Sequence, residues 1–566
     1  MTSARQYRPL RARNVGVALI ALAAPLALMT NLHGRAAAET AVRHAARRAA
    51  GSVTTPLSVD WKFTGTYFSS NPASPTLSAD TAYFVSGNAV YAVALDTGGL
   101  KWRYPADTAA YLPKLVEFTP TLANGKLFIS APDGLYALSA ADGKLLWRFA
   151  PAGKSQVLGS PIVLENTVYF TCQNGRMYAV DGTTGEFAGG AYSLPNRPAG
   201  IDIGGDLGAE PSIYNGELFY VTSSQDLHAR NIVSGVNRWT VHLSNDISVA
   251  KPVFYGDGFY LSLGSTFSSW KTNGQVRWSI SLPTDAAVPP VVDENGTAYI
   301  VLGDRSVYSI NSHGKGTWRK AAHIPNRALA QPVVTNNLLI VTTALGGITA
   351  FDTATGELKW NYKLTPSSDD PENVPTITSV ASRTVVQGDT LYALSDDGSL
   401  TAFRHDAIDS DPPVIDKLEP ENGVVINGRP PVHISAHIVD EGSGLDLSTL
   451  TLKLDDQLIG RRDATDEPAK GIADNGFSWK ADTNTIEYTT IESDTGGKSS
   501  QLADGHHTIT VTVKDWKGNQ LNKTWNFIAD DTVKKIRKSD TANGPGRGGP
   551  GVGPGGLGGG KGGGGE

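Results

Sequence analysis

The stretch LYALSAADGKLLW, residues 135–147, contains the pattern that decides the fold of this 566-residue chain. An alternating apolar run leads into a polar turn that ends in Gly143, and Trp147 stands four residues further on. Alternation predicts a β-strand, and a polar turn closed by glycine predicts a hairpin. The same spacing recurs along the chain. Its tryptophans are Trp102, Trp147, Trp239, Trp278, Trp318 and Trp360, and Gly189 stands at the corresponding position of the third unit.

The repeat has a period of about 42 residues, which is the length of a four-stranded propeller blade. Units begin with a proline, such as Pro120 or Pro211, that leads into a first apolar strand. The eighth unit ends without a tryptophan strand, whereas Trp61 near the N-terminus is in phase with the period. We therefore expect the strand around Trp61 to complete the last blade. The sequence predicts an all-β fold, with an eight-bladed β-propeller over residues 57–405.

We interpret the recurring tryptophans as packing residues rather than as ligands of a cofactor. A tryptophan on an outer strand can bury about 150–250 Å² across the joint between two blades. The predicted joint residues are Trp61, Trp102, Trp147, Trp239, Trp278, Trp318 and Trp360.

The repeats LYALSAADGKLLW and AFDTATGELKW (350–360) resemble those of the pyrroloquinoline-quinone-like β-propellers. That superfamily includes quinoprotein alcohol dehydrogenases and the outer-membrane protein assembly lipoprotein. The resemblance implies the fold more strongly than the function, because the repeated residues are structural. Many quinoprotein dehydrogenases have adjacent cysteines near the cofactor and a calcium ion held by carboxylate and amide side chains. Here Cys172 is the sole cysteine, no calcium ligand set can be mapped, and the lipidated cysteine of the assembly lipoprotein is missing.

The segments outside the repeat predict export and a second domain. Residues 1–38 combine a basic start, an apolar run and small residues, which predicts a cleaved signal peptide, with an uncleaved anchor helix as the alternative. Residues 39–56 are then a linker. Residues 411–530 alternate with period two and predict a β-sandwich that resembles bacterial immunoglobulin-like modules. The glycine-rich residues 531–566 predict a disordered tail.

Two motifs of the predicted sandwich contain residue types that bind metals. His433 and His437 lie on one face of a predicted strand, but no third ligand accompanies them, so we interpret them as ordinary histidines. The stretch VDEGSGLD (439–446) is compatible with calcium, and an acidic turn without a metal accounts for it equally well. The sequence leaves the metal content of the protein open.

Candidate binding residues lie on polar segments that we expect to connect the outer strand of one blade to the inner strand of the next. The longest segment, residues 190–211, follows the unit that lacks tryptophan. Arg197 and Arg327 each follow a Pro-Asn pair and would together suit an anionic ligand, whereas neighbouring carboxylates would pair with them or take a cation. The alternative is that these segments are solvated and bind nothing. The candidates are Arg197, Asp202, Asp206, Glu210, His323, Arg327, Asp369, Asp370 and Glu372.

The sequence contains no phosphate-binding loop, nucleophile elbow or metalloprotease motif, and its net charge of −6 gives no reason to expect nucleic acid as a partner. We expect an extracytoplasmic, monomeric scaffold without catalytic residues or a cofactor, and without a membrane span after cleavage. Its partner would be a protein or glycan of the cell envelope. The alternative, implied by the resemblance, is an oxidoreductase that uses pyrroloquinoline quinone (PQQ) and calcium.

Overall fold

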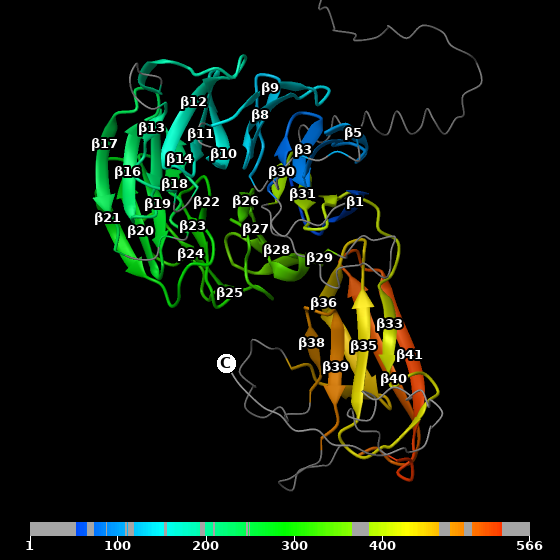
Figure 1. Ribbon diagram of the computed structural model, residues 1–566. Coiled ribbons are helices and arrows are strands. Elements are labelled where there is room, and N and C mark those ends of the chain that lie inside the picture. Colours follow the sequence, from blue (N-terminus) through cyan, green and yellow to red (C-terminus); the bar gives the residue numbers. More distant parts are fainter. Residues whose placement is uncertain are drawn as a thin grey trace, which may run out of the picture.

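The protein is described by a computed structural model that covers most of residues 52–534. The described ranges are 52–64, 73–86, 88–107, 110, 112, 118–151, 155–192, 199–207, 210–244, 247, 249–364, 384–462, 476–491 and 501–534. The predicted signal peptide and most of the predicted tail lie outside these residues. Figure 1 shows a ring of sheets with an elongated C-terminal domain at one side of it.

Eight four-stranded antiparallel sheets form the blades of the ring, which confirms the predicted propeller. Each blade has an inner, a second, a third and an outer strand, and the inner strands of successive blades contact one another around the axis. Blades 1 to 4 consist of β2 (Thr76–Leu77), β3 (Thr81–Ser86), β4 (Ala89–Ala94) and β5 (Leu100–Tyr104); β6 (Thr121–Ala123), β7 (Lys126–Ala131), β8 (Gly134–Ser139) and β9 (Leu145–Phe149); β10 (Val157–Leu164), β11 (Thr167–Cys172), β12 (Arg176–Asp181) and β13 (Ile201–Asp202); and β14 (Ser212–Tyr214), β15 (Glu217–Val221), β16 (Asp226–Asn231) and β17 (Asn237–His242).

The remaining blades have the same order of strands, and blade 8 takes its outer strand from the N-terminus. Blades 5 to 8 consist of β18 (Val253–Tyr255), β19 (Gly258–Leu263), β20 (Thr266–Lys271) and β21 (Val276–Ser281); β22 (Val291–Val292), β23 (Ala298–Val301), β24 (Ser306–Ile310) and β25 (Ala322–His323); β26 (Val333–Thr335), β27 (Leu338–Thr342), β28 (Gly347–Asp352) and β29 (Leu358–Lys363); and β30 (Val385–Gln387), β31 (Thr390–Leu394), β32 (Leu400–Arg404) and β1 (Ser58–Phe63). Two short 3₁₀ turns, η2 (Gly190–Tyr192) and η3 (Ala344–Gly346), lie among the described residues.

The pairing of β1 with β32 closes the ring and confirms the predicted role of the N-terminal strand. Trp61 is opposite Ala402, and the register shifts by one residue just before Trp61. The outer strands of blades 2 and 7 have the same geometry, since Trp147 is opposite Ala137 and Trp360 is opposite Ala350, each after a shift in register. A small residue opposite each tryptophan leaves room for its ring, so β1 is a regular outer strand.

A buried arginine holds the closing blade together. Arg404, at the end of β32, is 1% exposed and forms ion pairs with three carboxylates. The closest nitrogen–oxygen distances are 3.8 Å to Asp60, 3.1 Å to Asp389 and 2.7 Å to Asp406. Asp60 belongs to β1 and Asp389 immediately precedes β31, so one guanidinium links three strands of blade 8.

Six of the eight joints between blades are made by a tryptophan and a glycine that belong to different repeats. Trp102 of blade 1 donates its indole N–H to the carbonyl oxygen of Ala140 in the turn of blade 2, at 3.0 Å. Gly143 in that turn has a φ of +70°, and a Cβ there would lie 2.5 Å from the Trp102 ring. Only glycine suits both requirements. The corresponding bonds are Trp61 to Leu95, Trp147 to Gly182, Trp239 to Thr272, Trp278 to Ser312 and Trp318 to Thr353.

The C-terminal domain is a sandwich of two sheets around one apolar core. Its strands β40 and β41 form an antiparallel hairpin, while the immunoglobulin-like assignment stays an interpretation. One sheet has the order β33-β35-β39-β38 and the other β34-β41-β40-β36-β37. The strands are β33 (Val414–Glu419), β34 (Val425–Ile426), β35 (His433–Val439), β36 (Leu445–Leu454), β37 (Gln457–Ile459), β38 (Ser478–Lys480), β39 (Thr485–Thr489), β40 (Gly505–Asp515) and β41 (Gln520–Ala529). Within the described ranges, no helix has the length and apolar character needed to span a membrane.

The closure of the ring can be tested at Trp61. We expect Trp61→Ala to lower the free energy of unfolding by about 3–5 kcal/mol, because it removes an aromatic ring packed at a joint. Urea denaturation measures this loss. The exposed Leu145 on β9 provides a control, and Leu145→Ala is expected to cost less than about 0.5 kcal/mol. Deletion of residues 52–63 should destabilise the protein further, and an unchanged stability would contradict closure by β1.

The buried ion pairs of blade 8 give a second prediction. Arg404→Leu should cost about 3–5 kcal/mol, because it leaves carboxylates in the closing blade without their cation. Arg148→Leu is the control, since its pair with Asp133 is partly exposed and worth less than about 1 kcal/mol. Equal losses for the two variants in urea denaturation would show that Arg404 has no special role in closure.

Candidate functional site

Side-chain hydrogen bonds tie the starts of inner strands together in three pairs of neighbouring blades. Three residues with hydroxyl groups, Thr76, Thr121 and Ser212, come directly after the proline that leads into an inner strand. Each donates to the carbonyl oxygen of the corresponding proline in the next blade, Pro120, Pro161 and Pro252, at 2.5–2.6 Å. These bonds form a rigid frame from which the connections between blades project.

Polar groups from four successive connections between blades bond to one another, and we call this group the axial chain. It consists of the side chains of Glu210, Lys251 and Gln331 and the backbone carbonyl of Pro290. The Lys251 ammonium pairs with the Glu210 carboxylate and lies 3.4 Å from Oε1 of Gln331. Nε2 of Gln331 donates to the carbonyl oxygen of Pro290 at 2.6 Å. The Lys251 side chain is 19% exposed, so its charge is largely occupied by these partners.

Sequence reasoning identified Glu210 but missed Lys251 and Gln331. All three immediately precede the proline that leads into an inner strand, as in Glu210-Pro211, Lys251-Pro252 and Gln331-Pro332. A search for long polar side chains at the position before this proline would have found the axial chain.

The other predicted site residues are dispersed. Asp206 and Arg327 are exposed in connections between blades, with their backbones bonded to Ser223 and Ala344 in the neighbouring turns. Asp202 accepts a hydrogen bond from the Gly204 backbone N–H at 2.9 Å. Within the described part of the chain, no ion pair joins Asp202, Asp206, His323 or Arg327 to another predicted residue. Arg197, Asp369, Asp370 and Glu372 lie outside the described residues.

The structure corrects the expectation that residues 190–211 form a connection between blades. Ile201 and Asp202 form β13, the outer strand of blade 3, and pair with Met177 and Arg176 of β12. The chain leaves the edge of this sheet at Gly189 and Gly190, which both have positive φ, and returns at Ile201. The outer edge of blade 3 is therefore interrupted between Gly190 and Ile201. His323 likewise belongs to an outer strand, β25, rather than to a loop.

The joint without tryptophan is filled by other residues of the same segment. Tyr192 donates its hydroxyl to the carbonyl oxygen of Ile232 at 2.5 Å, which is the bond that a tryptophan makes at other joints. Ile201 packs against Gly235 in the turn of blade 4. A small, mostly apolar pocket remains between blades 3 and 4, with Tyr169, Met177 and Tyr220 among its lining residues. Tyr192 and Ile201 thus take the place of the tryptophan at this joint.

The joint between blades 7 and 8 is completed by the C-terminal sandwich. Blade 8 lacks the usual turn between its third and outer strands, because β1 comes from the N-terminus. The loop 440–444, between β35 and β36, takes that place. Trp360 donates its indole N–H to the carbonyl oxygen of Ser443 at 2.9 Å, and the Val59 backbone N–H donates to Gly442 at the same distance. Gly444 has a φ of +84°, and a Cβ there would lie 2.8 Å from the Asn361 carbonyl oxygen.

Further bonds hold the sandwich against the outer edge of blade 7. The Trp516 indole donates to the carbonyl oxygen of Asn361 at 3.1 Å. The Lys363 ammonium donates to the carbonyl oxygen of Ala481 at 2.6 Å, and burial lowers the pKa of Lys363 to about 8. Figure 1 shows β29 beside β36 at this junction.

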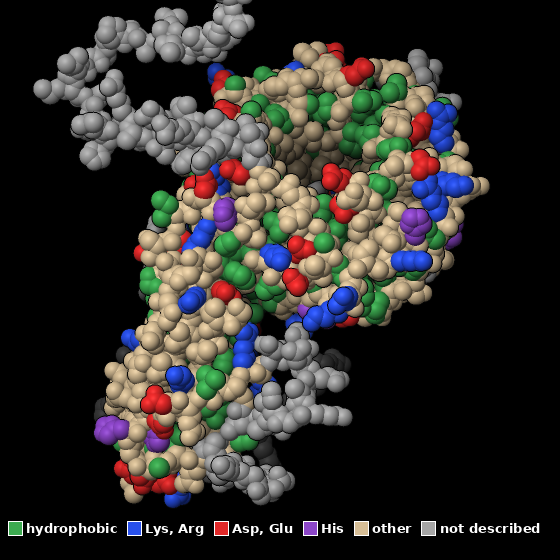
Figure 2. Space-filling view, turned by 180° about the vertical axis from the view of Figure 1, so that it is seen from behind, with side chains coloured by type: hydrophobic (Ala, Val, Ile, Leu, Met, Phe, Trp, Pro, Cys, Tyr) green, Lys and Arg blue, Asp and Glu red, His purple; other side chains and the backbone are tan. Residues whose placement is uncertain are grey.

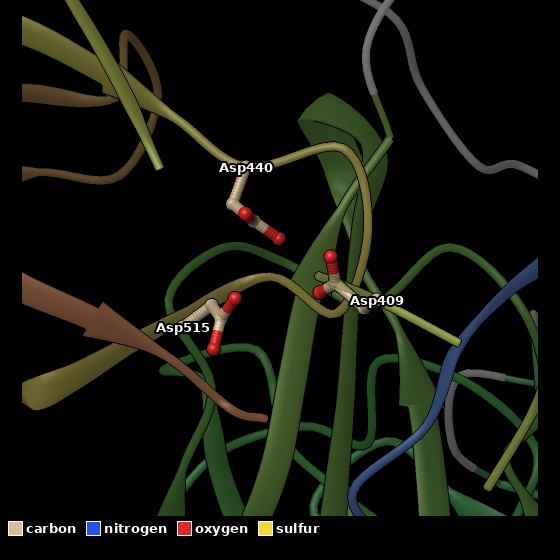
Figure 3. Close-up of side chains that lie close together, drawn as sticks. All are labelled: Asp409, Asp440 and Asp515. Atoms are coloured by element: carbon tan, nitrogen blue, oxygen red, sulfur yellow. The ribbon is translucent and has the colours of Figure 1, made fainter. Parts of the chain in front are cut away.

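Three carboxylates converge at this junction, as Figure 3 shows. Asp409 lies on the linker after β32, Asp440 begins the loop 440–444, and Asp515 ends β40. One oxygen atom of each lies within 4.8 Å of the others. Asp440 accepts hydrogen bonds from the backbone N–H groups of Ser443 and Gly444. Asp515 accepts two from Asn519, one from its backbone N–H and one from its side-chain amide.

The carboxylates of this group are poorly solvated. Asp515 is 2% exposed, and burial is the main cause of the upward shift in its pKa. Burial also raises the pKa of Asp440 to about 6, and the charges of Asp409 and Asp515 add to this effect. A group of three acids from three segments is a candidate metal centre, and it includes the acidic stretch 439–446 of the sequence.

The histidines His433 and His437 are separated from this group. His437 pairs with Asp416 at 2.5 Å, and Nε2 of His433 lies 3.9 Å from Glu419. Each histidine thus has a different carboxylate of β33 as its partner, which supports their interpretation as ordinary surface residues.

Comparison with known proteins places the ring in a family. Residues 58–266 and 267–407 match the family model of the outer membrane protein assembly factor BamB. The chain belongs to this family. The matched residues are those of the propeller, including the closing strand β1, and they end before the sandwich begins.

The individual relatives of this chain are named for different functions. The tetrathionate hydrolase of Acidithiobacillus ferrooxidans is 24% identical over 288 residues, covering 43% of this chain and 57% of that protein. The quinohemoprotein alcohol dehydrogenase ADH-IIG of Pseudomonas putida is 23% identical, covering 47% and 34%. BamB of Bordetella pertussis is 23% identical, covering 51% and 73%. The chain thus spans about a third to three fifths of the first two relatives, so family membership leaves the activity open.

The junction predicts a contrast between two glycine substitutions in the sandwich. Gly423 has a φ of +78° with open space around it, whereas Gly444 has a similar φ and faces the Asn361 backbone. We expect Gly444→Ala to cost about 1–3 kcal/mol more than Gly423→Ala, because only the former forces the loop 440–444 away from blade 7. Hydrogen exchange at the Val59 amide should accelerate in Gly444→Ala alone. Equal exchange in both variants would contradict docking of the loop.

Proposed function

We propose that this protein is an extracytoplasmic scaffold without catalytic activity, whose propeller presents a rigid face to a protein or glycan partner of the cell envelope. The axial chain is the observation that carries the proposal. Glu210, Lys251 and Gln331 bond to one another and to the Pro290 carbonyl, so this face is a preorganised surface rather than an open polar pocket.

The exposed charges around the axial chain support recognition of a polar partner. Asp206 and Arg327 are exposed in connections between blades, and His323 lies on the adjoining outer strand. Figure 2 shows the propeller hollowed, with hydrophobic side chains beside the hollow and charged ones at its edges. A rigid rim of mixed character suits a protein or glycan surface. Membership of the BamB family supports a protein partner, and the N-terminal pattern supports export.

The alternative is a PQQ-dependent oxidoreductase with calcium, which the similarity to a quinohemoprotein alcohol dehydrogenase favours. The cysteine and the acidic residues of this chain do not fit PQQ and its calcium ion. Cys172 is buried in β11 as the sole cysteine, and burial raises the pKa of its thiol to about 12. Among the described residues, the group of three acids able to hold a metal lies at the junction with the sandwich, away from the axis.

The scaffold proposal predicts a difference between the two faces of the ring. In an extract of the cell envelope, the double variant Asp206→Ala/Arg327→Ala should lose a partner that the intact protein captures, because both residues are exposed in connections between blades. The matched control is Lys144→Ala/Lys315→Ala, which removes two charges from turns at the opposite end of the blades. Equal capture by all three proteins, with folding intact, would remove these residues from the function.

Addition of PQQ tests the alternative directly. The melting temperature is compared with calcium alone and with calcium plus PQQ, so that any effect of the metal by itself is subtracted. A ligand at 100 times its dissociation constant stabilises the folded state by about 2.7 kcal/mol. We expect no additional shift from PQQ. A saturable shift would overturn the cofactor-free scaffold in favour of the quinoprotein.

A further inference from the structure

The junction between propeller and sandwich contains buried polar atoms that lack partners. Oδ2 of Asp409 and the hydroxyl of Ser443 are shielded from solvent, and neither has a hydrogen-bond partner among the described residues. Ser443 is 0% exposed. Buried polar groups are almost always satisfied, and an unfilled ion position is one of the few reasons for an exception. The Asp409 atom belongs to one of the three converging carboxylates, and Ser443 adjoins the group because its backbone N–H donates to Asp440. These open atoms indicate that a ligand belongs here.

The ligand must be a cation, because the group has little positive charge of its own. Within the described residues, Asp409, Asp440 and Asp515 form no ion pair with lysine or arginine. Lys517 is a nearby cation whose charge interacts with Asp409 and Asp515, but its ammonium donates a hydrogen bond to the carbonyl oxygen of His405. Like charges this close are unfavourable in a partly buried site, and a divalent ion would compensate for them.

We propose that Asp409, Asp440 and Asp515 bind a calcium ion that fastens the sandwich to the seam of the propeller. The ligand atoms are oxygens from three separate segments, without histidine or cysteine, which suits a hard cation rather than zinc. Calcium accepts irregular sets of six to eight oxygens, so carboxylates, the free Ser443 hydroxyl and water are suitable ligands, whereas magnesium demands a near-ideal octahedron.

The position of the ion gives it a structural role. Asp409 lies on the linker, Asp440 lies on the loop that packs under Trp360, and Asp515 lies on the sandwich hairpin. A bound calcium ion would hold all three segments together. Because Gly442 of this loop accepts a hydrogen bond from Val59 on β1, calcium binding also protects the closing strand of the ring.

Calorimetric titration of the full chain with calcium, after treatment with a chelator, tests the site. We expect one ion to bind with a dissociation constant of roughly 10⁻⁵–10⁻³ M, in the range of sensor and extracellular sites. Asp440→Asn and Asp515→Asn should each weaken binding at least about tenfold. Asp446→Asn is the matched control, because Asp446 belongs to the same acidic stretch but caps Ser448 instead. Calcium should also slow hydrogen exchange at the Val59 amide in the intact protein.

A second measurement guards against variants that are merely unfolded. Without calcium, Asp440→Asn should melt at or above the temperature of the intact protein, because it removes a repelling buried charge. With calcium, only the intact protein and the Asp446→Asn control should gain stability. No binding up to roughly 10 mM calcium, about ten times the weakest expected dissociation constant, would overturn the proposal. Equal binding by the intact protein and Asp440→Asn would overturn it as well.

Discussion

The antiparallel pairing of β1 with β32 is the interaction on which the rest of the structure depends. Because the first and last parts of the propeller chain share a blade, the ring has no seam held by packing alone. Here the shared blade is reinforced by Arg404, whose buried guanidinium reaches Asp60 on β1 as well as two acids of blade 8. Unfolding of β1 would therefore break a sheet edge, a joint at Trp61 and a buried ion-pair group together.

This mode of closure has a cost that the sandwich offsets. In other joints, the hairpin turn of the next blade supplies a carbonyl group and a glycine to the tryptophan. Blade 8 has no such turn, because its third and outer strands come from opposite ends of the chain. The loop 440–444 supplies the carbonyl of Ser443 to Trp360 instead, and Gly444 makes the close approach to blade 7. The sandwich is thus part of the ring closure rather than an independent appendage.

The sequence pattern was sufficient for the ring but not for the sites. Trp61 could be placed on the last blade because its distance from Trp102 in the sequence matches the repeat length. Each tryptophan also requires a small residue opposite it. Gly189 signalled a changed joint, but the two-residue strand β13 carries too little periodicity to be recognised from sequence. Asp409, Asp440 and Asp515 share no local pattern, since their proximity depends on how the sandwich docks. Lys251 and Gln331 were predictable in principle, because each stands before the proline of an inner strand.

The two irregular joints differ in what they make possible. Between blades 3 and 4, Tyr192 and Ile201 reproduce the contacts of a tryptophan and leave a small, mostly apolar pocket, which offers little for specific recognition of a charged ligand. Between blades 7 and 8, the substitute comes from another domain and brings acidic side chains into a partly buried setting. A repeat protein confines the energetic effect of each irregular joint to the neighbouring units. The axial chain and the closing joint therefore depend on different residues and different interactions, so a substitution in one should leave the other intact.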